Sequence, residues 1–313
     1  MDYTALGRTG LRVSVMGLGC GGPSRVGQSY GKSEEESVEV VSAALAHGVT
    51  FFDTAEGYGT ESILGRGLRG TPRDDVVVST KMSPVNGKEI VPASRVRSAL
   101  EESLERLGMG YVDIYHIHGL AAEHYEYAVN EFVPELLKLR DQGKLRFLGV
   151  TEAFVPDPGH EMLQRAVQDD CWDVVMVGFN ILNQSARDRV LAAARAKDIG
   201  VLVMFAVRRA LSDPARLQGL LADLRQRGLV DPETPAEGSG LDFLVRDGGA
   251  TSLQDAAYRF CRHEPGVHVV LSGTGNLSHL ESNVASLGRP PLPPEDVARL
   301  REMFARVDDV SGN

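Results

Sequence analysis

The chain has 313 residues, of which 42% are hydrophobic and 24% are charged, so it can build one or two globular domains with a sizeable core. Its 33 lysines and arginines against 43 aspartates and glutamates give a net charge of −10, which argues against nucleic acid or an anionic membrane surface as the main partner. No apolar run approaches the ~18 residues of a membrane span, no signal-peptide pattern opens the chain, and the three cysteines are widely spaced, so we expect a cytoplasmic protein without disulfides or a metal site.

The predicted elements alternate between short strands and longer helices along almost the whole chain. A small hairpin over residues 3–10, with its turn at Arg8-Thr9-Gly10, comes first. Brief runs rich in Val, Ile and Phe predict strands at 14–18, 50–52, 76–80, 113–117, 147–150, 174–177, 201–204 and 268–271. Apolar residues at three- and four-residue spacing predict helices at 33–47, 61–68, 93–107, 123–142, 161–169, 186–197, 253–262 and 277–287.

Local signals support the first of these helices. Ser33 and Glu36 have the spacing of a capping box, in which each side chain bonds the other residue's backbone N–H. Gly48 suits the left-handed cap that ends a helix.

Eight strands and eight helices in alternation predict an α/β (β/α)8 TIM barrel, with residues 1–313 forming one domain. The hairpin is expected to close the barrel floor, and an extra C-terminal helix is expected at 294–307. The seventh strand is followed by a long loop, residues 205–250, with a helix near 215–227 and loop signals at Asp231-Pro232, Thr234-Pro235 and 238–240. Such loops in barrels commonly serve as lids or binding loops.

Four ionisable residues lie where barrel strands end, which is where barrel active sites form. Asp53, Lys81 and His118 each follow or close a predicted strand, and Tyr58 lies in a glycine-containing loop five residues after Asp53. A barrel lysine can form a Schiff base, as in aldolases. Alternatively, a lysine paired with an aspartate can stabilise a tyrosinate, which suits general acid–base catalysis. The short Asp53–Tyr58 spacing favours the second scheme.

Six short segments occur in order along the predicted barrel. They are Leu6-Gly7-Arg8-Thr9-Gly10-Leu11 with Val13-Ser14, Phe52-Asp53-Thr54-Ala55 before Tyr58, Ser79-Thr80-Lys81, Asp113-Ile114-Tyr115-His116-Ile117-His118, Gly149-Val150-Thr151, and Ser272-Gly273-Thr274 leading to Asn283. This combination resembles the aldo-keto reductase family over nearly the whole chain.

The resemblance implies hydride transfer between a nicotinamide cofactor and a carbonyl or alcohol substrate, such as an aldehyde, a ketone or a sugar. The family's catalytic tetrad maps onto Asp53, Tyr58, Lys81 and His118, since His118 rather than His116 occupies the motif position. Tyr58 would donate the proton, Lys81 held by Asp53 would lower the pKa of Tyr58, and His118 would orient the carbonyl. No metal is needed.

The positions that hold the nicotinamide in the family are only partly kept. Thr151 retains the hydroxyl, whereas Glu152 stands at the usual Asn and Met176 at the usual Gln. A carboxylate at 152 would favour the oxidised, cationic ring, so Glu152→Gln is expected to bind the oxidised cofactor more weakly relative to the reduced one. The usual stacking aromatic aligns with Ala206, beside Phe205, and Arg208-Arg209 replace a proline-leucine, where they could grip the pyrophosphate.

The segment after strand eight would hold the adenosine end of the cofactor. A helix N-terminus there offers free amides for a phosphate. The candidate contacts are Ser272, Thr274, Asn276, His279, in place of the usual Arg, and Asn283. NADP(H) is the family's usual cofactor and is expected here, with NAD(H) as the alternative, because residues 270–288 contain no Lys or Arg.

The substrate pocket would be walled by strand-end and loop residues, for which the candidates are Cys20, Tyr30, Met82, Leu120 and Phe154. A second hypothesis is a regulatory role, since the resemblance extends to potassium-channel β subunits, which use the same fold for redox sensing and turn over slowly. We expect a small-molecule carbonyl or alcohol as partner, no nucleic acid and no membrane, with the oligomeric state open.

Overall fold

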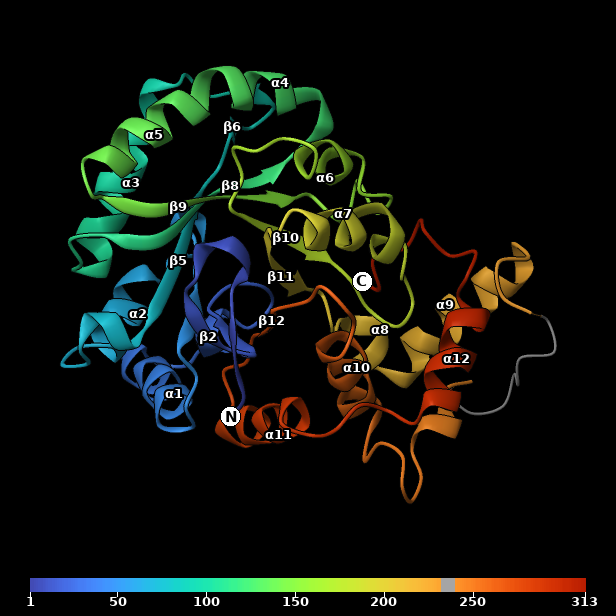
Figure 1. Ribbon diagram of the computed structural model, residues 1–313. Coiled ribbons are helices and arrows are strands. Elements are labelled where there is room, and N and C mark those ends of the chain that lie inside the picture. Colours follow the sequence, from blue (N-terminus) through green and yellow to red (C-terminus); the bar gives the residue numbers. More distant parts are fainter. Residues whose placement is uncertain (232–239) are drawn as a thin grey trace.

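The computed structural model describes residues 1–231 and 240–313, and its centre is a closed barrel of eight parallel strands (Figure 1). Around the barrel the order is β10, β11, β12, β3, β4, β5, β8 and β9, which confirms the predicted (β/α)8 TIM barrel. The strands are β3 Met16–Gly19, β4 Phe51–Asp53, β5 Val77–Met82, β8 Val112–Leu120, β9 Leu145–Glu152, β10 Val174–Gly178, β11 Gly200–Met204 and β12 Val269–Ser272.

Helices cover the outside of the barrel, as the spacing of apolar residues predicts. They are α1 Glu34–Ala46, α2 Glu61–Gly67, α3 Ser94–Leu107, α4 Tyr125–Tyr127, α5 Val133–Asp141, α6 Glu161–Ala166, α7 Ala192–Ala196, α10 Leu253–Arg262 and α11 Leu277–Leu287. The capping box of Ser33 and Glu36 is present at the start of α1.

Two predicted helices are not uniform. The segment predicted at 123–142 contains a π-helical turn at Ala128–Phe132 between α4 and α5, and the one at 186–197 begins with another at Arg187–Leu191. A π-turn inserts one residue into the helical repeat, and apolar spacing does not reveal it. A second antiparallel pair, β6 Val85–Asn86 and β7 Glu89–Ile90, follows β5 and was not predicted.

The N-terminal hairpin closes the lower end of the barrel, as expected. Its strands, β1 Tyr3–Ala5 and β2 Arg12–Ser14, flank the turn. The turn predicted at Arg8-Thr9-Gly10 is a 3-10 turn at Gly7–Thr9. Arg8 donates to the carbonyl oxygens of Asp170 and Trp172, just before β10 begins. Gly7 takes a positive φ of 48° against residues 198–200, where a Cβ would lie 2.5 Å from the Asp198 oxygen.

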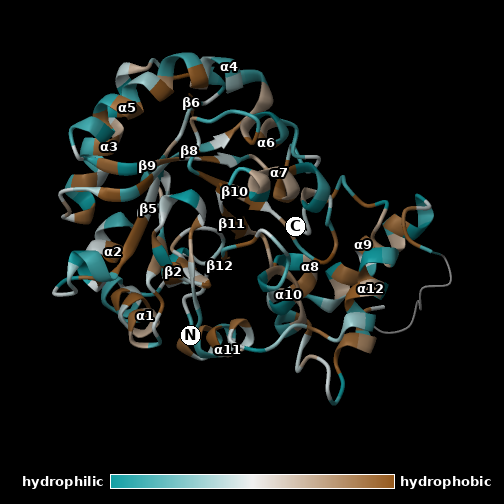
Figure 2. Cartoon of the chain, in the orientation of Figure 1, coloured by the Kyte–Doolittle hydropathy of each residue, from teal (hydrophilic) through white to brown (hydrophobic). Residues whose placement is uncertain are grey.

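The hydrophobic core has two parts, which reflect the alternation of side chains along each strand. One fills the lower barrel interior and joins hairpin residues Leu6, Leu11 and Val13 to strand residues such as Phe51 and Ile114. The larger part lies between the strands and the helices. Figure 2 shows helices that alternate between hydrophobic and hydrophilic residues, as this packing requires.

The long segment after β11 contains α8 Arg209–Ser212 and α9 Pro214–Gln226, close to the helix predicted there. The loop signals predicted between 232 and 239 lie outside the described residues. The last helix, α12 Pro294–Met303, is shorter than predicted. None of the described helices is both long and apolar enough to span a membrane.

Candidate active site

The structure brings the four residues of the predicted tetrad together at the upper end of the barrel. Asp53 ends β4, Lys81 lies on β5, and His118 lies on β8, which continues past its predicted end through an irregularity between Ile117 and Leu120. Tyr58 comes from the 3-10 turn Glu56–Tyr58, between β4 and α2.

Lys81 and Asp53 form a buried ion pair. The Lys81 Nζ donates to Asp53 Oδ2 at 2.6 Å and to the Thr54 carbonyl oxygen at 2.7 Å, while Ser79 Oγ donates to Asp53 Oδ1 at 2.9 Å. Burial disfavours the charged ammonium, but the Asp53 carboxylate outweighs it and raises the pKa of Lys81. The amine is therefore held protonated, which favours the charge-stabilising scheme over a Schiff base.

Tyr58 and His118 form the second half of the site. The Tyr58 hydroxyl lies 3.1 Å from His118 Nε2, and Lys81 Nζ lies 5.1 Å from the centre of the Tyr58 ring. Burial raises the pKa of Tyr58, and the Lys81 charge only partly opposes this effect. Burial and Lys81 together lower the pKa of His118 to about 3. In the resting site Tyr58 is thus a neutral phenol beside a neutral imidazole.

His116 lies one layer below His118 inside the barrel. It is fully buried, and among the described residues neither ring nitrogen has a hydrogen-bond partner. The ring occupies the space left by Gly149 on β9, where a Cβ would lie 2.2 Å from His116 Nδ1. Burial holds the pKa of His116 well below its usual value.

The low pKa values of His116 and His118 in the folded protein predict a loss of stability in mild acid. The pKa of each is lower in the folded than in the unfolded state, so the unfolded chain binds more protons as the pH falls below 6.5. The free energy of unfolding should then fall by about 1.4 kcal/mol per pH unit for each histidine. Urea unfolding at about pH 7 and about pH 5 measures this slope. His116→Leu should make this slope smaller, because it removes one of the histidines whose pKa is lowered by burial.

Glu152 lies in a buried hydrogen-bonded chain at the ends of β9 and β10. Its carboxylate is 2.9–3.0 Å from His160 Nδ1, and Oε1 also accepts from the Gly178 N–H at 2.7 Å. His160 Nε2 in turn lies 3.0 Å from Ser185 Oγ, and Phe154 stacks on the His160 ring. Both the Glu152 and the His160 side chains have no exposed surface.

The hydrogen bonds around Ser185 fix the number of protons in this chain. The Asn183 amide is oriented because its Nδ2 donates to two backbone carbonyls and its Oδ1 accepts from the Ser185 N–H. The single Ser185 hydroxyl hydrogen therefore goes to Asn183 Oδ1, at 2.7 Å, and Ser185 Oγ accepts from His160 Nε2. A second proton lies between His160 Nδ1 and Glu152, so the pair has no net charge.

Ser185, His160 and Glu152 do not have the proton arrangement of a catalytic triad. The order serine, histidine, carboxylate is that of a hydrolytic triad, but the Ser185 hydrogen points away from His160, which therefore cannot accept it as a base. A neutral pair also removes the basis for the expected attraction between Glu152 and an oxidised nicotinamide. Glu152→Gln is now expected to change the affinities for oxidised and reduced cofactor equally.

The other residues expected near the nicotinamide lie around the same end of the barrel. Thr151 is buried and its Oγ1 accepts from the Gly119 N–H at 2.7 Å, while Met176 belongs to the barrel interior. Phe205 has a positive φ of 68°, and the Arg208 guanidinium lies 3.9 Å from its ring centre. Arg209 is exposed.

Arg208 is a half-buried cation without a carboxylate partner among the described residues. Its Nε and Nη2 both donate to Asn313 Oδ1, a neutral acceptor, at 2.8 and 2.5 Å. Burial and the neighbouring Arg209 lower the pKa of Arg208. A site that holds an unpaired guanidinium next to a second one suits an anion.

The segment after β12 leads into the N-terminus of α11, as expected, but two of the amides there are not free. Asn276 caps the helix by accepting from the N–H groups of Ser278 and His279, and Thr274 Oγ1 accepts from the Asn276 N–H. Asn283 donates to Ser272 Oγ at 2.9 Å. The His279 side chain is exposed. The roles of these residues toward a cofactor stay predictions.

The residues expected to wall the substrate pocket are mostly covered. Cys20, Met82 and Leu120 are fully buried in the core between strands and helices, because the neighbour of an inward-facing side chain such as Lys81 faces outward. Phe154 is buried against His160, and Tyr30 is 72% exposed. Contact with substrate stays a prediction for all five residues. Cys20, Met82 and Leu120 could reach a substrate only if the residues that bury them moved aside.

Sequence reasoning missed several residues that shape the site. Arg25, at a positive φ of 45°, donates through Nε to the Tyr58 carbonyl oxygen at 2.7 Å. Glu56 accepts from the Ser83 N–H and from Arg95. Glu56 sits in the same turn as Tyr58, which was the one signal in the sequence. The paths of the loops that bring Arg25 and His160 in are not encoded by any periodicity.

The chain is similar to an enzyme of Arabidopsis thaliana and to several solved structures. A stretch of 157 residues is 40% identical to the L-galactose dehydrogenase of Arabidopsis thaliana, and the match spans about half the length of that relative and 48% of this chain. An aldo-keto reductase of Bacillus halodurans in its holo form matches with a TM-score of 0.72 and 21% identity, over 97% of this chain and 96% of that one.

A second structure, the aldo/keto reductase of Klebsiella pneumoniae in complex with NADP and acetate, matches with a TM-score of 0.70 and 22% identity, over 97% and 96% of the two chains. At these identities the structural matches show the fold. The profile of the Aldo/keto reductase family, however, matches residues 16–305. The chain therefore belongs to the aldo/keto reductase family.

Proposed function

We propose that this protein is an oxidoreductase that transfers a hydride between a nicotinamide cofactor and a carbonyl or alcohol substrate. The observation that carries the proposal is the geometry of the tetrad. A neutral phenol, Tyr58, contacts a neutral imidazole, His118, and lies beside a buried ammonium, Lys81, that is paired with Asp53.

In the reductive direction, the bound nicotinamide supplies the hydride that reaches the carbonyl carbon. Tyr58 donates its proton to the carbonyl oxygen, so the carbonyl gains one hydride and one proton and becomes an alcohol. Lys81 stabilises the phenolate left on Tyr58, and Asp53 keeps Lys81 charged and oriented. The neutral His118 can donate a hydrogen bond to the same oxygen, which stabilises its developing negative charge.

The residues of the barrel mouth fit a nicotinamide dinucleotide. The guanidinium of Arg208, which has no carboxylate partner among the described residues, and the neighbouring Arg209 supply positive charge for the pyrophosphate. The helix dipole of the 11-residue α11 adds positive potential at its N-terminus, although the Asn276 side chain already accepts from two of its N–H groups. Thr151 provides a hydroxyl for the nicotinamide carboxamide. NADP(H) is the proposed cofactor, supported by the family, with NAD(H) as the alternative because α11 carries no Lys or Arg.

Replacing Arg208 should weaken cofactor binding. A charge-assisted hydrogen bond contributes ~1.5–3 kcal/mol, so Arg208→Gln should raise the Kd for NADPH at least about tenfold. Titration of the fluorescence of the reduced cofactor measures this. Arg12→Gln, on the floor hairpin, is the matched control and should bind as the wild type does. Equal affinities for the Arg208 variant and the wild type would remove Arg208 from the cofactor site.

A steady-state assay tests the function itself. NADPH and NADH are each offered with a panel of aldehydes, ketones and aldoses, and the oxidised cofactors with aldoses. The similarity to L-galactose dehydrogenase over half of the chain favours a sugar substrate and the oxidative direction. Turnover in seconds would support an enzyme. Turnover that stays very slow across the panel, with tight cofactor binding, would favour a redox-sensing regulatory subunit instead.

A further inference from the structure

We propose that Glu56 and Glu61 are positioning residues that fix Tyr58 against Lys81 through two parallel anchors. The proposal rests on the function proposed above, because it concerns the geometry of the same proton donor. Tyr58 lies between the two glutamates in the chain, and Lys81 lies between Thr80 and Ser83. Each glutamate bonds a residue close to Lys81: Glu61 bonds Thr80, directly before it, and Glu56 bonds Ser83, two residues after it.

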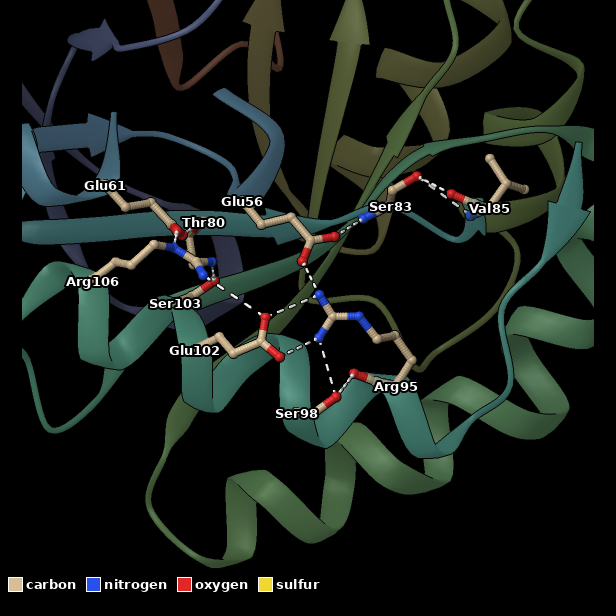
Figure 3. Close-up of polar contacts among 10 residues, drawn as sticks. All are labelled: Glu56, Glu61, Thr80, Ser83, Val85, Arg95, Ser98, Glu102, Ser103 and Arg106. Carbon is tan, nitrogen blue, oxygen red and sulfur yellow. Dashed lines mark hydrogen bonds and ion pairs between the residues drawn. The ribbon is translucent and has the colours of Figure 1, made fainter. Parts of the chain in front are cut away.

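The first anchor is on the N-terminal side of Tyr58. Glu56 Oε1 accepts from the Ser83 N–H at 2.8 Å, and Oε2 accepts from Arg95 Nη2 at 2.8 Å (Figure 3). The Glu56 side chain is only 16% exposed. One carboxylate thus ties the turn that carries Tyr58 both to the end of β5 and to the start of α3.

The second anchor is on the C-terminal side of Tyr58. Glu61, the first residue of α2, has a side chain that is 1% exposed and accepts from Thr80 Oγ1 at 2.6 Å. Its other oxygen accepts from Arg106 Nε, also at 2.6 Å. Thr80 directly precedes Lys81, so this bond fixes α2 to the strand at the level of the lysine.

Helix α3 joins the two anchors. Glu102 lies between them on this helix, with its carboxylate oxygens 3.1 and 3.2 Å from the guanidinium of Arg95 and 3.8 Å from that of Arg106. Figure 3 shows the resulting chain of alternating charges, Glu56, Arg95, Glu102, Arg106 and Glu61, lying along one side of α3. Both anchors therefore contact the same helix, through Arg95 and Arg106, rather than two independent loops.

Within the turn, the Tyr58 N–H donates to the Ala55 carbonyl oxygen at 3.0 Å, and the anchors add side-chain bonds to this backbone bond. Tyr58 is flanked by Gly57 and Gly59, the second at a positive φ of 68°, and glycine restricts the chain least. Arg25 bonds the Tyr58 carbonyl oxygen, the Tyr58 hydroxyl contacts His118 on β8, and Glu56, the other side chain of this turn, bonds Ser83 after β5. A displacement of the phenol by about 1 Å can cost ~10²-fold in rate.

A cavity beside the first anchor makes the proposal testable by chemical rescue. It has a volume of about 500 Å³ and is lined by Glu56, Ser83 and Arg95, together with Asn86, Ser94 and Ser98. The Arg95 side chain is 32% exposed. Removing it would enlarge this cavity next to the Glu56 carboxylate, which leaves room for a free guanidinium ion.

Arg95→Ala should lower kcat about tenfold while leaving the Kd for cofactor unchanged, because the phenol moves and the cofactor contacts do not. Added guanidinium, below denaturing concentrations, should restore much of the lost kcat. Arg97→Ala, on the same helix but paired with Glu101, is the control and should show neither the loss nor the rescue. Glu56→Gln keeps an acceptor for Ser83 and should lose less activity than Glu56→Ala.

A second readout separates this proposal from the proposed function. With 3-fluorotyrosine incorporated, the Tyr58 fluorine signal, assigned by its loss in Tyr58→Phe, should shift in Arg95→Ala and return on addition of guanidinium. If wild-type protein lacks turnover but the signal shifts and returns, the anchors stand and the proposed function fails. If wild-type protein turns over but Arg95→Ala changes neither kcat nor the fluorine signal, the anchors are overturned.

Discussion

Tyr58→Phe is expected to lower kcat by ~10²–10⁴-fold while leaving the Kd for cofactor within about twofold of the wild-type value. The substitution removes only the hydroxyl, whose hydrogen bond to His118 spans 3.1 Å, and keeps the ring beside Lys81. The proton donor is lost, whereas the proposed cofactor contacts, at Arg208 and α11, are distant in sequence and untouched. Steady-state kinetics and cofactor fluorescence titration measure the two quantities.

Tyr111→Phe provides the matched control. Its hydroxyl bonds Asp74 at the surface, outside the barrel mouth, so the same chemical change there should leave kcat unaltered. Retention of near-normal turnover in Tyr58→Phe would show that another group supplies the proton, and would withdraw the assignment of the tetrad.

The second large effect is expected at the neutral pair. His160→Leu should reduce the free energy of unfolding by ~3–5 kcal/mol, because it leaves Glu152 buried without its proton-sharing partner. Glu152→Gln alone should cost little. Its amide oxygen can accept from the Gly178 N–H and its amide nitrogen can donate to His160 Nδ1, while the ring proton on Nε2 still goes to Ser185.

The double variant Glu152→Gln, His160→Leu makes the test specific. It should be more stable than His160→Leu alone, since the amide that replaces Glu152 carries no charge to bury. Urea unfolding of the four proteins gives the coupling between the two positions. Costs that simply add, or a cost in Glu152→Gln as large as in His160→Leu, would contradict the neutral pair.

The loss of stability in His160→Leu is expected to depend on pH. Burial raises the pKa of Glu152. In His160→Leu the carboxyl would take up a proton in the folded state more readily than in the unfolded state. The deficit of that variant should therefore be largest near neutral pH and shrink as the pH falls toward 5.

The fold and the tetrad could be predicted from the sequence because both follow from local patterns. Parallel strands that are buried on both faces appear in the sequence as short apolar runs. Residues at the ends of these strands, such as Asp53 and Lys81, must meet at one end of a barrel. A position near a strand end does not by itself set the direction of a side chain. Met82 follows Lys81 and therefore points to the opposite side, into the layer beneath the helices.

The contacts of Glu152 could not be predicted, because they depend on loops. His160 lies eight residues beyond Glu152, at a positive φ of 64°, and Ser185 comes from the loop after β10. No periodicity fixes the path of such loops, so a carboxylate could be predicted at this position but its partner could not. The protonation of the pair depends in addition on the orientation of Asn183, which is known only from the complete hydrogen-bond network.

The fit of His116 against Gly149 has a consequence for how this barrel can diverge. The imidazole occupies the volume of the side chain that Gly149 lacks, and a Cβ there would lie 2.2 Å from its nitrogen. The two positions are opposite each other on neighbouring strands and therefore act as one unit of volume. Among related sequences, any residue larger than glycine at position 149 should be accompanied by a smaller residue at position 116. Substitutions at the two positions should thus covary.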